Sequence, residues 1–518
     1  MHSGHFFRHH ARKGLTLLAL SLLAGACTMK PQPFTSAEFQ RKGAEDRALM
    51  FAQQAPLSKP ITLHDAMARA VKFNLDRRAK MMEEVLALGQ FDLDRFDMLP
   101  KLTANAGYVY RSDHATTTSR DSVTGQMALA NPYYSLDKSR NVADLTLSWN
   151  ILDFGASWYT AQQNGDRALI AAERRRKSIA NLMQEVRYSY WRAVAAQTLQ
   201  LSVRQAITLA EQALADARKV EKENLRNPAE ALRYQKGLMD NLRQLENVDQ
   251  ELNTAKFELA ALINIPPQTP LLFDSPNTEA MAVPDWRMPL PQMEELTFAN
   301  NPDLREQLYQ SRIAVDDTRK ALLRLLPGIN LSTGRQYDNN SFLMDHGWNE
   351  ASARISFNLF NLLSAPENLQ QAETVQKVAE MKRLALRMAV LAQVHVIHFQ
   401  FAHSQQQFQR ASEQYNIEAR LADIAAKRQE GNAQSLLERI NNQTSAIAAN
   451  LRRYQSFAQM QFNLGRMQAT LGIDPFPENI SNTDLEELSA LFKKRYEVFD
   501  QGMIPAEIST ETTANDAS

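Results

Sequence analysis

Three histidines come closest in this sequence to a cluster of metal-ligating side chains. His395, His398 and His403 are spaced by 3 and then 5 residues, so two of them could share one face of a helix and offer imidazole nitrogens to a cation such as Zn²⁺. The chain contains an internal repeat, described below, and the related positions 208 residues earlier hold no histidine. We therefore interpret the three histidines as polar positions of a helical wall, and we predict no metal site.

Other chemistry finds little support in the sequence. There is no Gly-x-x-x-x-Gly-Lys-Ser/Thr loop for a nucleotide and no Gly-x-Ser-x-Gly nucleophile turn, and Cys27 is the single cysteine. The 58 basic and 58 acidic side chains balance, which removes the electrostatic argument for a nucleic-acid partner. We predict that the protein is not an enzyme, has no cofactor and binds no nucleic acid.

The segment before Cys27 has the features of an export signal. Basic residues are followed by the apolar run Leu15–Leu23 and by small residues that suit cleavage. The sequence Ala24-Gly25-Ala26-Cys27 resembles a bacterial lipobox, which implies cleavage after residue 26 and lipidation of Cys27, for instance by palmitate. By the same resemblance, Thr28 implies the outer membrane. An ordinary signal peptide with an incidental cysteine is the alternative. Residues 27–60 are then an anchored extension.

The composition predicts a mostly helical protein. Only 17 of 518 residues are glycine, about 3%, whereas roughly 7% is average and all-β turns consume glycine. After residue 26 we expect no stretch with the roughly 20 apolar residues that a membrane-spanning helix needs. A bilayer would have to be crossed by another structure.

The chain contains two copies of one unit, which we place at 61–282 and 288–476. Residues 63–100 match 290–327 at an offset of 227, and 147–154 match 355–362 at an offset of 208. The difference of 19 residues lies between Pro100 and Leu147, in a loop. Residues 477–518 remain as a C-terminal tail, which we expect to be partly disordered.

Each copy contains two segments of alternating polarity. We predict strands at about 101–111 and 142–151, and at about 329–337 and 351–359, the third being weaker because Arg335 falls on its apolar side. Alternating segments of about ten residues with aromatic ends are typical of transmembrane β-barrels. Four strands cannot close a barrel, so several chains must contribute: two give eight strands and three give twelve. Two amphipathic hairpins on a soluble core are the alternative.

The rest of each copy is predicted to be helical. Residues 158–227 and 367–430 lack proline, and at 1.5 Å per residue each makes a helix of about 100 Å. Leu199, Val203, Ala206, Ala210, Ala213, Ala217 and Val220 form a heptad seam. The basic run 174–177 is interpreted as a solvated helix face. Two shorter helices per copy could stack end to end beside the long one.

Together these features resemble the outer membrane efflux protein family, the TolC-like lipoprotein channels, over residues 61–476. The resemblance implies this fold class: α with membrane β, in duplicated helix–hairpin–long helix–helix units that form a trimeric 12-stranded β-barrel continuous with a periplasmic α-helical tunnel. It also implies a homotrimer in outer-membrane lipid that serves as a passive exit duct. A periplasmic adaptor (membrane fusion protein) and an inner-membrane transporter are the implied partners.

The resemblance also implies roles for residues near the two helical turns. Those in the place of the adaptor-docking turns are Lys219, Asn224, Asn227, Lys427, Gly431 and Ser435. Glu230 and Glu438, related by the 208 offset, would form a carboxylate ring at the periplasmic entrance. The family has aspartates nearby where this chain has Leu437. Outward-facing glutamates balanced by Arg233 and Arg439 are the alternative.

The sequence leaves several functional questions open. Drug efflux, metal efflux and protein secretion by a type I system all remain compatible with it. A lipid-anchored periplasmic coiled-coil scaffold without a pore is the alternative from another functional class.

Overall fold

The computed structural model describes residues 32–52, 54–57, 59–118, 120–127, 133–223, 227–274, 281–430, 435–473, 480 and 483–504. The chain divides into two compact units, Met1–Gln54 and Ala55–Ser518. In the first unit, helix α2 (Ser36–Phe51) begins with a capping box between Thr35 and Glu38, and none of its residues is buried. The predicted site residues Cys27, Asn224 and Gly431 lie outside the described residues.

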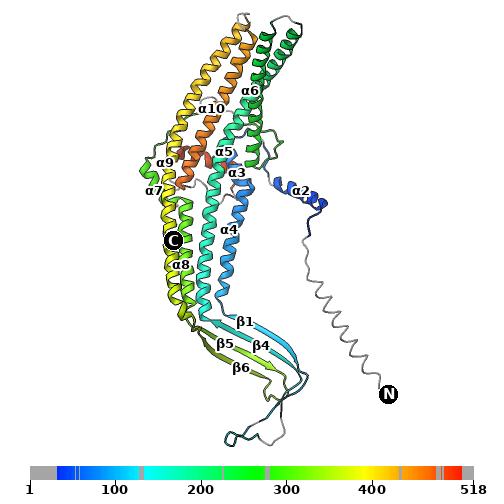
Figure 1. The fold of residues 1–518 in the computed structure, drawn as a ribbon, viewed down its shortest axis with the longest axis vertical. Helices are drawn as coiled ribbons and strands as arrows, with labels where there is room; N and C mark the ends of the chain where they lie inside the picture. Colours follow the sequence, from blue (N-terminus) through cyan, green and yellow to red (C-terminus); the bar gives the residue numbers. More distant parts are fainter. Residues whose placement is uncertain are drawn as a thin grey trace, which may run out of the picture. The chain divides into compact units, whose positions relative to one another are not determined.

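The second unit combines long helices with a four-stranded sheet (Figure 1). Its helices are α3 (Leu63–Phe73), α4 (Leu75–Asp94), the 3-10 helix η1 (Phe96–Met98), α5 (Ile151–Lys222), α6 (Pro228–Leu262), α7 (Leu290–Asn300), α8 (Pro302–Leu323), α9 (Asn361–Glu430), α10 (Leu436–Leu471) and α11 (Leu485–Phe499). Its strands are β1 (Lys101–Tyr110), β2 (Ala115–Thr117), β3 (Tyr133–Leu136), β4 (Ser139–Asn150), β5 (Gly328–Asp338) and β6 (Gly347–Ser356). The predominantly helical fold predicted from the composition is confirmed.

The large sheet is antiparallel throughout, in the order β1-β4-β5-β6, while β2 and β3 form a separate hairpin. Strand β6 covers 347–356, where the sequence predicts about 351–359. It begins earlier because Gly347 and Trp348 still pair with Tyr337 and Gln336 of β5. The alternation is visible in the sequence only for the later residues, so the polar first half of the strand escapes prediction.

Helices form a wall that continues from the sheet (Figure 1). Beside the sheet, the neighbours in contact are α4 with α5, α5 with α8, and α8 with α9. Towards the other end, α6 packs on α5, α5 on α10, and α10 on α9. Helices α5 and α9 therefore run through both halves, and shorter helices share the length beside each of them.

The shorter helices meet end to end at two asparagines. Asn74 caps α4 by accepting from Arg77 N (3.0 Å), and its Nδ2 donates to the carbonyl of Leu262 at the end of α6 (3.1 Å). Asn301 likewise caps α8, and its Nδ2 donates to the Thr470 carbonyl near the end of α10 (3.0 Å). The predicted stacking of short helices is confirmed at both places.

The seam predicted on α5 is buried at six of its seven positions, from Leu199 to Ala217. It packs against α6 through Leu238, Leu245 and Leu252, and against α10 through Ile440 and Ile447. Alanine knobs allow this close approach because they occupy little volume between the helix backbones.

Helix α9 corrects one expectation. Among the described residues it is the one helix long and apolar enough, by length and composition, to cross a membrane. Val390, Val394, Ile397 and Phe401 in this helix are buried, whereas Met388, Val396 and Phe399 are at least half exposed, so burial within the chain covers only part of its apolar surface. The expectation that no such stretch occurs after residue 26 is therefore wrong.

The C-terminal region also differs from the expectation of a tail. Helix α11 packs on α3, and Leu488, Phe492 and Phe499 have at most 1% of their surface exposed. The guanidinium of Arg187 on α5, itself 1% exposed, donates to both carboxylate oxygens of Asp500 at 2.6 and 2.9 Å. Residues 485–500 therefore belong to the core of the second unit.

Candidate channel wall and entrance

The four-stranded sheet has one polar face and one mainly apolar face, which also carries Arg335 hydrogen-bonded to Asn349 at 3.2 Å. Directly paired residues lie on the same face, so Leu102 pairs with Leu147 and Ile329 with Ile355 on one side. On the other side, Asn105 donates to Asp144 (3.0 Å), and the hydroxyls of Ser332 and Ser352 lie 2.7 Å apart. The apolar face is open: Leu102 is 64% and Ile355 71% exposed. Such a face is stable when hydrocarbon covers it and the polar face meets water.

Aromatic side chains mark both ends of the apolar face. Those at the end remote from the helices are Tyr108, Tyr110 and Tyr337, while Trp348 at the same end pairs with Gln336 and so lies on the polar face. Those at the end joined to the helices are Trp149, Phe154, Phe357 and Phe360. All are more than a third exposed, and two such girdles are typical of strands that cross a bilayer.

At the end of the sheet remote from the helices, the loop before β4 is hydrogen-bonded to the loop after β5. Asp137, before β4, accepts from the amide (2.5 Å) and hydroxyl (2.9 Å) of Ser341, after β5. The hydrogen bond from the Ser341 amide holds the pKa of Asp137 below its ordinary value. Arg140 and Asp338 form an ion pair of 2.5 Å. The two hairpins of the sheet are thereby linked beyond their strands.

The turn between α5 and α6 carries three of the predicted site residues. Lys219 pairs with Asp216 at 3.3 Å, and both side chains are more than 70% exposed. Asn227 caps α6 by accepting from Ala229 N (2.9 Å). Glu230, in the first turn of α6, is exposed and forms no ion pair within the described residues.

The turn between α9 and α10 repeats this arrangement with other residues. Lys427 pairs with Asp423 at 2.6 Å, and Ser435 caps α10 by accepting from Glu438 N (3.3 Å). Glu438 is exposed and, like Glu230, has no ion pair in the part of the chain that the structure describes. Arg439, proposed as a balancing charge, donates instead to Gln429 at 2.5 Å.

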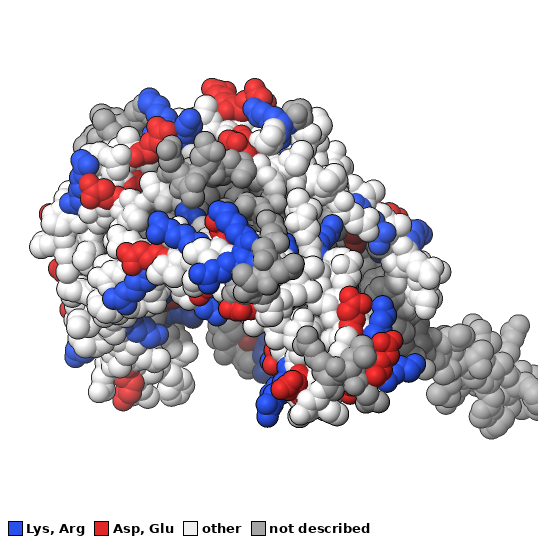
Figure 2. All heavy atoms as spheres, turned by 90° about the horizontal axis from the view of Figure 1, so that it is seen from above, with Lys and Arg blue, Asp and Glu red and all other residues white. Residues whose placement is uncertain are grey.

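The end of α5 and the start of α6 lie at the same end of the second unit as the end of α9 and the start of α10 (Figure 1). Asn241 on α6 donates to Asn441 on α10 at 2.5 Å, and Gly237 packs against the side chain of Leu437. Leu437 at the start of α10 therefore packs between the helix pair α5–α6 and the helix pair α9–α10. Basic and acidic side chains are interspersed over this end (Figure 2).

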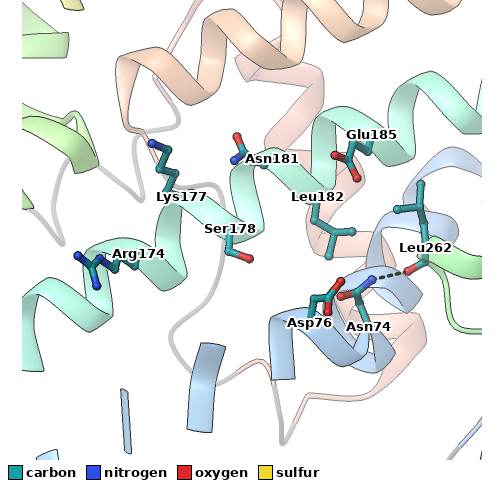
Figure 3. A pocket seen from close by; sticks show the side chains of 9 residues that line it. All are labelled: Asn74, Asp76, Arg174, Lys177, Ser178, Asn181, Leu182, Glu185 and Leu262. Carbon is teal, nitrogen blue, oxygen red and sulfur yellow. Dashed lines mark hydrogen bonds between the residues drawn. The ribbon is translucent and has the colours of Figure 1, made fainter. Parts of the chain in front are cut away.

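A polar cavity of about 300 Å³ lies where α4 and α6 meet beside α5 (Figure 3). Burial, together with nearby Asp76, raises the pKa of Glu185 at its edge. Arg174 and Lys177 also line it, but they are bound to Glu306 (2.6 Å) and Asp303 (2.7 Å) of α8. The cavity thus has charged walls whose cations already serve to join two helices.

These contacts refine the interpretation of the basic run 174–177 as a solvated face, because Arg174 (55% exposed) and Lys177 (49% exposed) are solvated and yet paired. Besides Arg174 and Lys177, Arg175 pairs with Glu84 of α4 at 2.6 Å, and Arg176 donates to the carbonyl of Gly472 at 2.9 Å. The run ties α5 to three neighbouring segments. Sequence alone could not show this, because the nearest of these partners is about 90 residues away.

The three histidines are separated in their contacts. His395 lies 2.9 Å from Glu294 of α7, and His403 lies 3.1 Å from Gln407 on its own helix. Among the described residues there is no group of three or more side chains that could hold a metal ion.

No family model matches the sequence, and no curated protein matches it. Solved structures do match the fold. The CmeC outer membrane channel of Campylobacter jejuni is 12% identical, with 90% of this chain and 97% of that chain covered and a TM-score of 0.60. The MtrE outer membrane channel of Neisseria gonorrhoeae, in its open state, is 15% identical (79% and 88% covered, TM-score 0.57). A structure of CusC, described in terms of transmembrane channel formation, is 16% identical (82% and 96% covered, TM-score 0.60).

Proposed function

We propose that this chain, which has the fold of the TolC-like outer membrane efflux channels, forms the outer-membrane duct of a tripartite efflux or type I secretion system. Three copies would close a twelve-stranded barrel that continues into a helical tunnel through the periplasm. The duct itself would be passive, and an inner-membrane pump would drive export through a periplasmic adaptor.

The observation that carries this proposal is the sheet. It has an exposed apolar face between two aromatic girdles, and within the described residues no strand pairs with the outer edge of β1 or of β6. Unpaired strand edges are not tolerated in hydrocarbon, so the edges must meet other strands. Because each chain contributes four alternating strands, copies can close a ring with every neighbour antiparallel. A scaffold without a pore would leave the apolar face in water.

We also propose that the chain is a duplicated unit, with copies at 61–282 and 288–476. Two regularities support this. Helices α3 and α7 coincide end for end at the 227 offset, Leu63–Phe73 with Leu290–Asn300. The two left-handed residues that end α6 and α10, Asn264 (φ 54) and Gly472 (φ 69), are related by the 208 offset.

The remaining assignments extend this proposal to sites. Cys27 would be lipidated and would anchor the extension 27–60 to the outer membrane. The two turns would dock the adaptor through Lys219, Asn224, Asn227, Lys427, Gly431 and Ser435. Exposed helix caps, as seen at Asn227 and Ser435, are compatible with a partner that packs over the turns.

The purified protein is expected to run as a heat-sensitive oligomer and to conduct ions in planar bilayers. Leu147→Arg, on the apolar face, should abolish insertion, because a basic residue facing lipid costs about 2–4 kcal/mol in the bilayer centre and each ring carries three. The neighbouring variant Thr146→Arg, on the polar face, is the matched control and should still conduct. A monomer without conductance, or equal tolerance of both variants, would refute the channel.

The entrance ring gives a separate expectation. Glu230→Gln with Glu438→Gln should lower the cation-to-anion permeability ratio of single channels, because six carboxylates would be removed from one opening. Glu246→Gln with Glu413→Gln removes the same charge from exposed positions along the wall and is the control. Equal selectivity of both double variants would place Glu230 and Glu438 outside the pore.

A further inference from the structure

The outer edges of β1 and β6, which are unpaired among the described residues, would meet between neighbouring copies. The pairing of β4 with β5 inside one chain is the equivalent contact. That contact joins the second strand of the first hairpin to the first strand of the second hairpin. In a ring, the contact between β6 of one copy and β1 of the next joins strands in the same order. The register of β4 with β5 is known, so it can be transferred to the contact between copies.

The β4–β5 register can be transferred only if the offsets of 227 and 208 hold residue by residue. The pairing within the two β-hairpins, β1 with β4 and β5 with β6, tests this. Within the first hairpin Lys101 pairs with Ser148. Adding 227 to the first strand and 208 to the second predicts that Gly328 pairs with Ser356, which is the pairing observed in the second hairpin. The same offsets can therefore be applied to the β4–β5 junction.

We infer that β6 of one copy pairs with β1 of the next copy in the register that sets Ala353 opposite Tyr108. This register comes from the observed pair of Leu145 with Arg335. Adding 208 to Leu145 of β4 gives Ala353 of β6, and subtracting 227 from Arg335 of β5 gives Tyr108 of β1. The inference rests on the proposed ring, but it does not depend on the number of copies. It defines the interface between subunits as a surface that fits a second copy of this chain.

Side-chain size supports this register independently. On the apolar face it sets Ala351 opposite Tyr110, Ala353 opposite Tyr108, Ile355 opposite Ala106 and Phe357 opposite Ala104. Each of these four pairs thus sets a large side chain against an alanine across the interface. Neighbouring side chains on a sheet face lie about 5 Å apart, so alternating large and small residues fill the surface evenly.

Charge points to the same register. Glu350 in β6 falls opposite Arg111, the residue after β1. Both side chains are exposed, and within the described residues neither has an ion-pair partner. A slip of two residues one way would set Glu350 opposite Asp113 and Ile355 opposite Tyr108. A slip the other way would set Phe357 opposite Leu102. A slip of one residue would turn apolar side chains to the polar face.

The helical wall next to the sheet fits the same transfer. Within one chain α5 and α8 are joined by ion pairs, such as Arg312 with Asp166 and Arg305 with Glu173. The related positions on α4 and α9, which would meet between copies, are Val85 (57% exposed) with Thr374 and Arg78 with Met381 (58% exposed), so neither ion pair has an ionic counterpart there. Apolar side chains at these outer helices become buried only if another copy covers them.

Cysteine pairs test the register directly in the full-length protein. Ala353→Cys with Tyr108→Cys should give disulfide-linked dimers and trimers on non-reducing gels. The slipped pairs Ala353→Cys with Tyr110→Cys, and Ala353→Cys with Ala106→Cys, should give much less. A link within one chain is excluded, because β1 and β6 are three strand spacings apart, about 14 Å, and a disulfide spans Cα atoms within about 7 Å.

The outcomes separate this inference from the ring itself. Efficient linking in a slipped pair, or an intact oligomer that links in none of the three, would overturn the register while leaving the channel proposal standing. A monomer that links in none would overturn both. As a second measurement, Glu350→Arg or Arg111→Glu should each lower the dissociation temperature of the oligomer, and the double reversal should restore it. Failure of that rescue would contradict the register.

Discussion

A chain with alanine in place of Gly472 is expected to fail to fold or to accumulate unassembled. Gly472 ends α10 at a φ of 69°, and a Cβ built there would overlap the carbonyl group of Asn300. The contact is with backbone, so no side-chain rotation relieves it. The left-handed conformation alone costs about 1–2 kcal/mol for alanine, and the overlap forces α10 away from the α7–α8 junction. Several kcal/mol is a large part of the roughly 5–15 kcal/mol that stabilises a protein of this kind.

Two variants separate the overlap from the backbone strain. Gly125 has nearly the same φ, 70°, but has no atom within 4 Å of a built Cβ, so Gly125→Ala should cost only the conformational part. Asn264→Gly, at the related position ending α6, should be at most mildly destabilising, because glycine accepts a φ of 54° freely while the contacts of the buried Asn264 side chain (7% exposed) are lost. Thermal unfolding and the yield of membrane-inserted oligomer measure all three. Equal, mild effects of both alanine variants would contradict the close approach.

The parts of the fold that depend on local periodicity could be predicted from the sequence. The alanine-rich heptad on α5 and the alternating strand residues lie next to one another in the chain, so their pattern is visible without a structure. The asparagines that join stacked helices are visible too, since Asn74 and Asn301 occupy related positions before each short helix. The second hydrogen bond of each asparagine, to the end of another helix, could not be predicted from the sequence, because Leu262 and Thr470 lie far along the chain.

Helix α11 shows how a correct inference about repeats can conceal a further element. The repeat ends near residue 476, which led to the expectation of a tail over residues 477–518. Yet Leu488, Phe492, Tyr496 and Phe499 recur at helical spacing and are all buried. That period is the signal in the sequence that could have predicted the helix. It is easily overlooked because the segment has no counterpart in the first copy.

Some properties of the site residues could be predicted from the sequence and others could not. The positions of Glu230 and Glu438 follow from the offset, and the structure places both in exposed first turns at one end of the helices. Whether either glutamate faces a pore depends on how neighbouring copies are arranged, and the sequence of one chain does not determine this arrangement. Leu437 illustrates the limit, since its contact with Gly237 is a packing contact between the two helix pairs.

The anchor of α11 is expected to be the other position at which one substitution has a large effect. Asp500→Ala would leave the Arg187 guanidinium, 1% exposed, with Gln461 (3.1 Å) as its remaining hydrogen-bond partner and with the ring of Tyr496, whose centroid lies 4.8 Å away. Removing one partner of a buried ion pair costs about 3–5 kcal/mol, because the remaining charge stays buried and uncompensated, and we expect the lower end of that range because the Asp500 side chain is 29% exposed. We expect a lower unfolding temperature and rapid proteolysis of residues 485–504.

Compensation distinguishes a buried charge from a general loss of contacts. Arg187→Met with Asp500→Ala removes both charges and keeps an apolar side chain against Tyr496, so it should recover the part of the stability lost through the buried charge, but not the hydrogen bond from Gln468 Nε2 to Asp500 (2.8 Å). Asp285→Ala is the matched control, because Asp285 pairs with Arg287 at 3.0 Å while both side chains are more than 60% exposed, and such pairs contribute about 0–1 kcal/mol. If the double variant were less stable than Asp500→Ala alone, Arg187 would stabilise the core chiefly through Gln461 and Tyr496. The docking of α11 would then not depend on its ion pair.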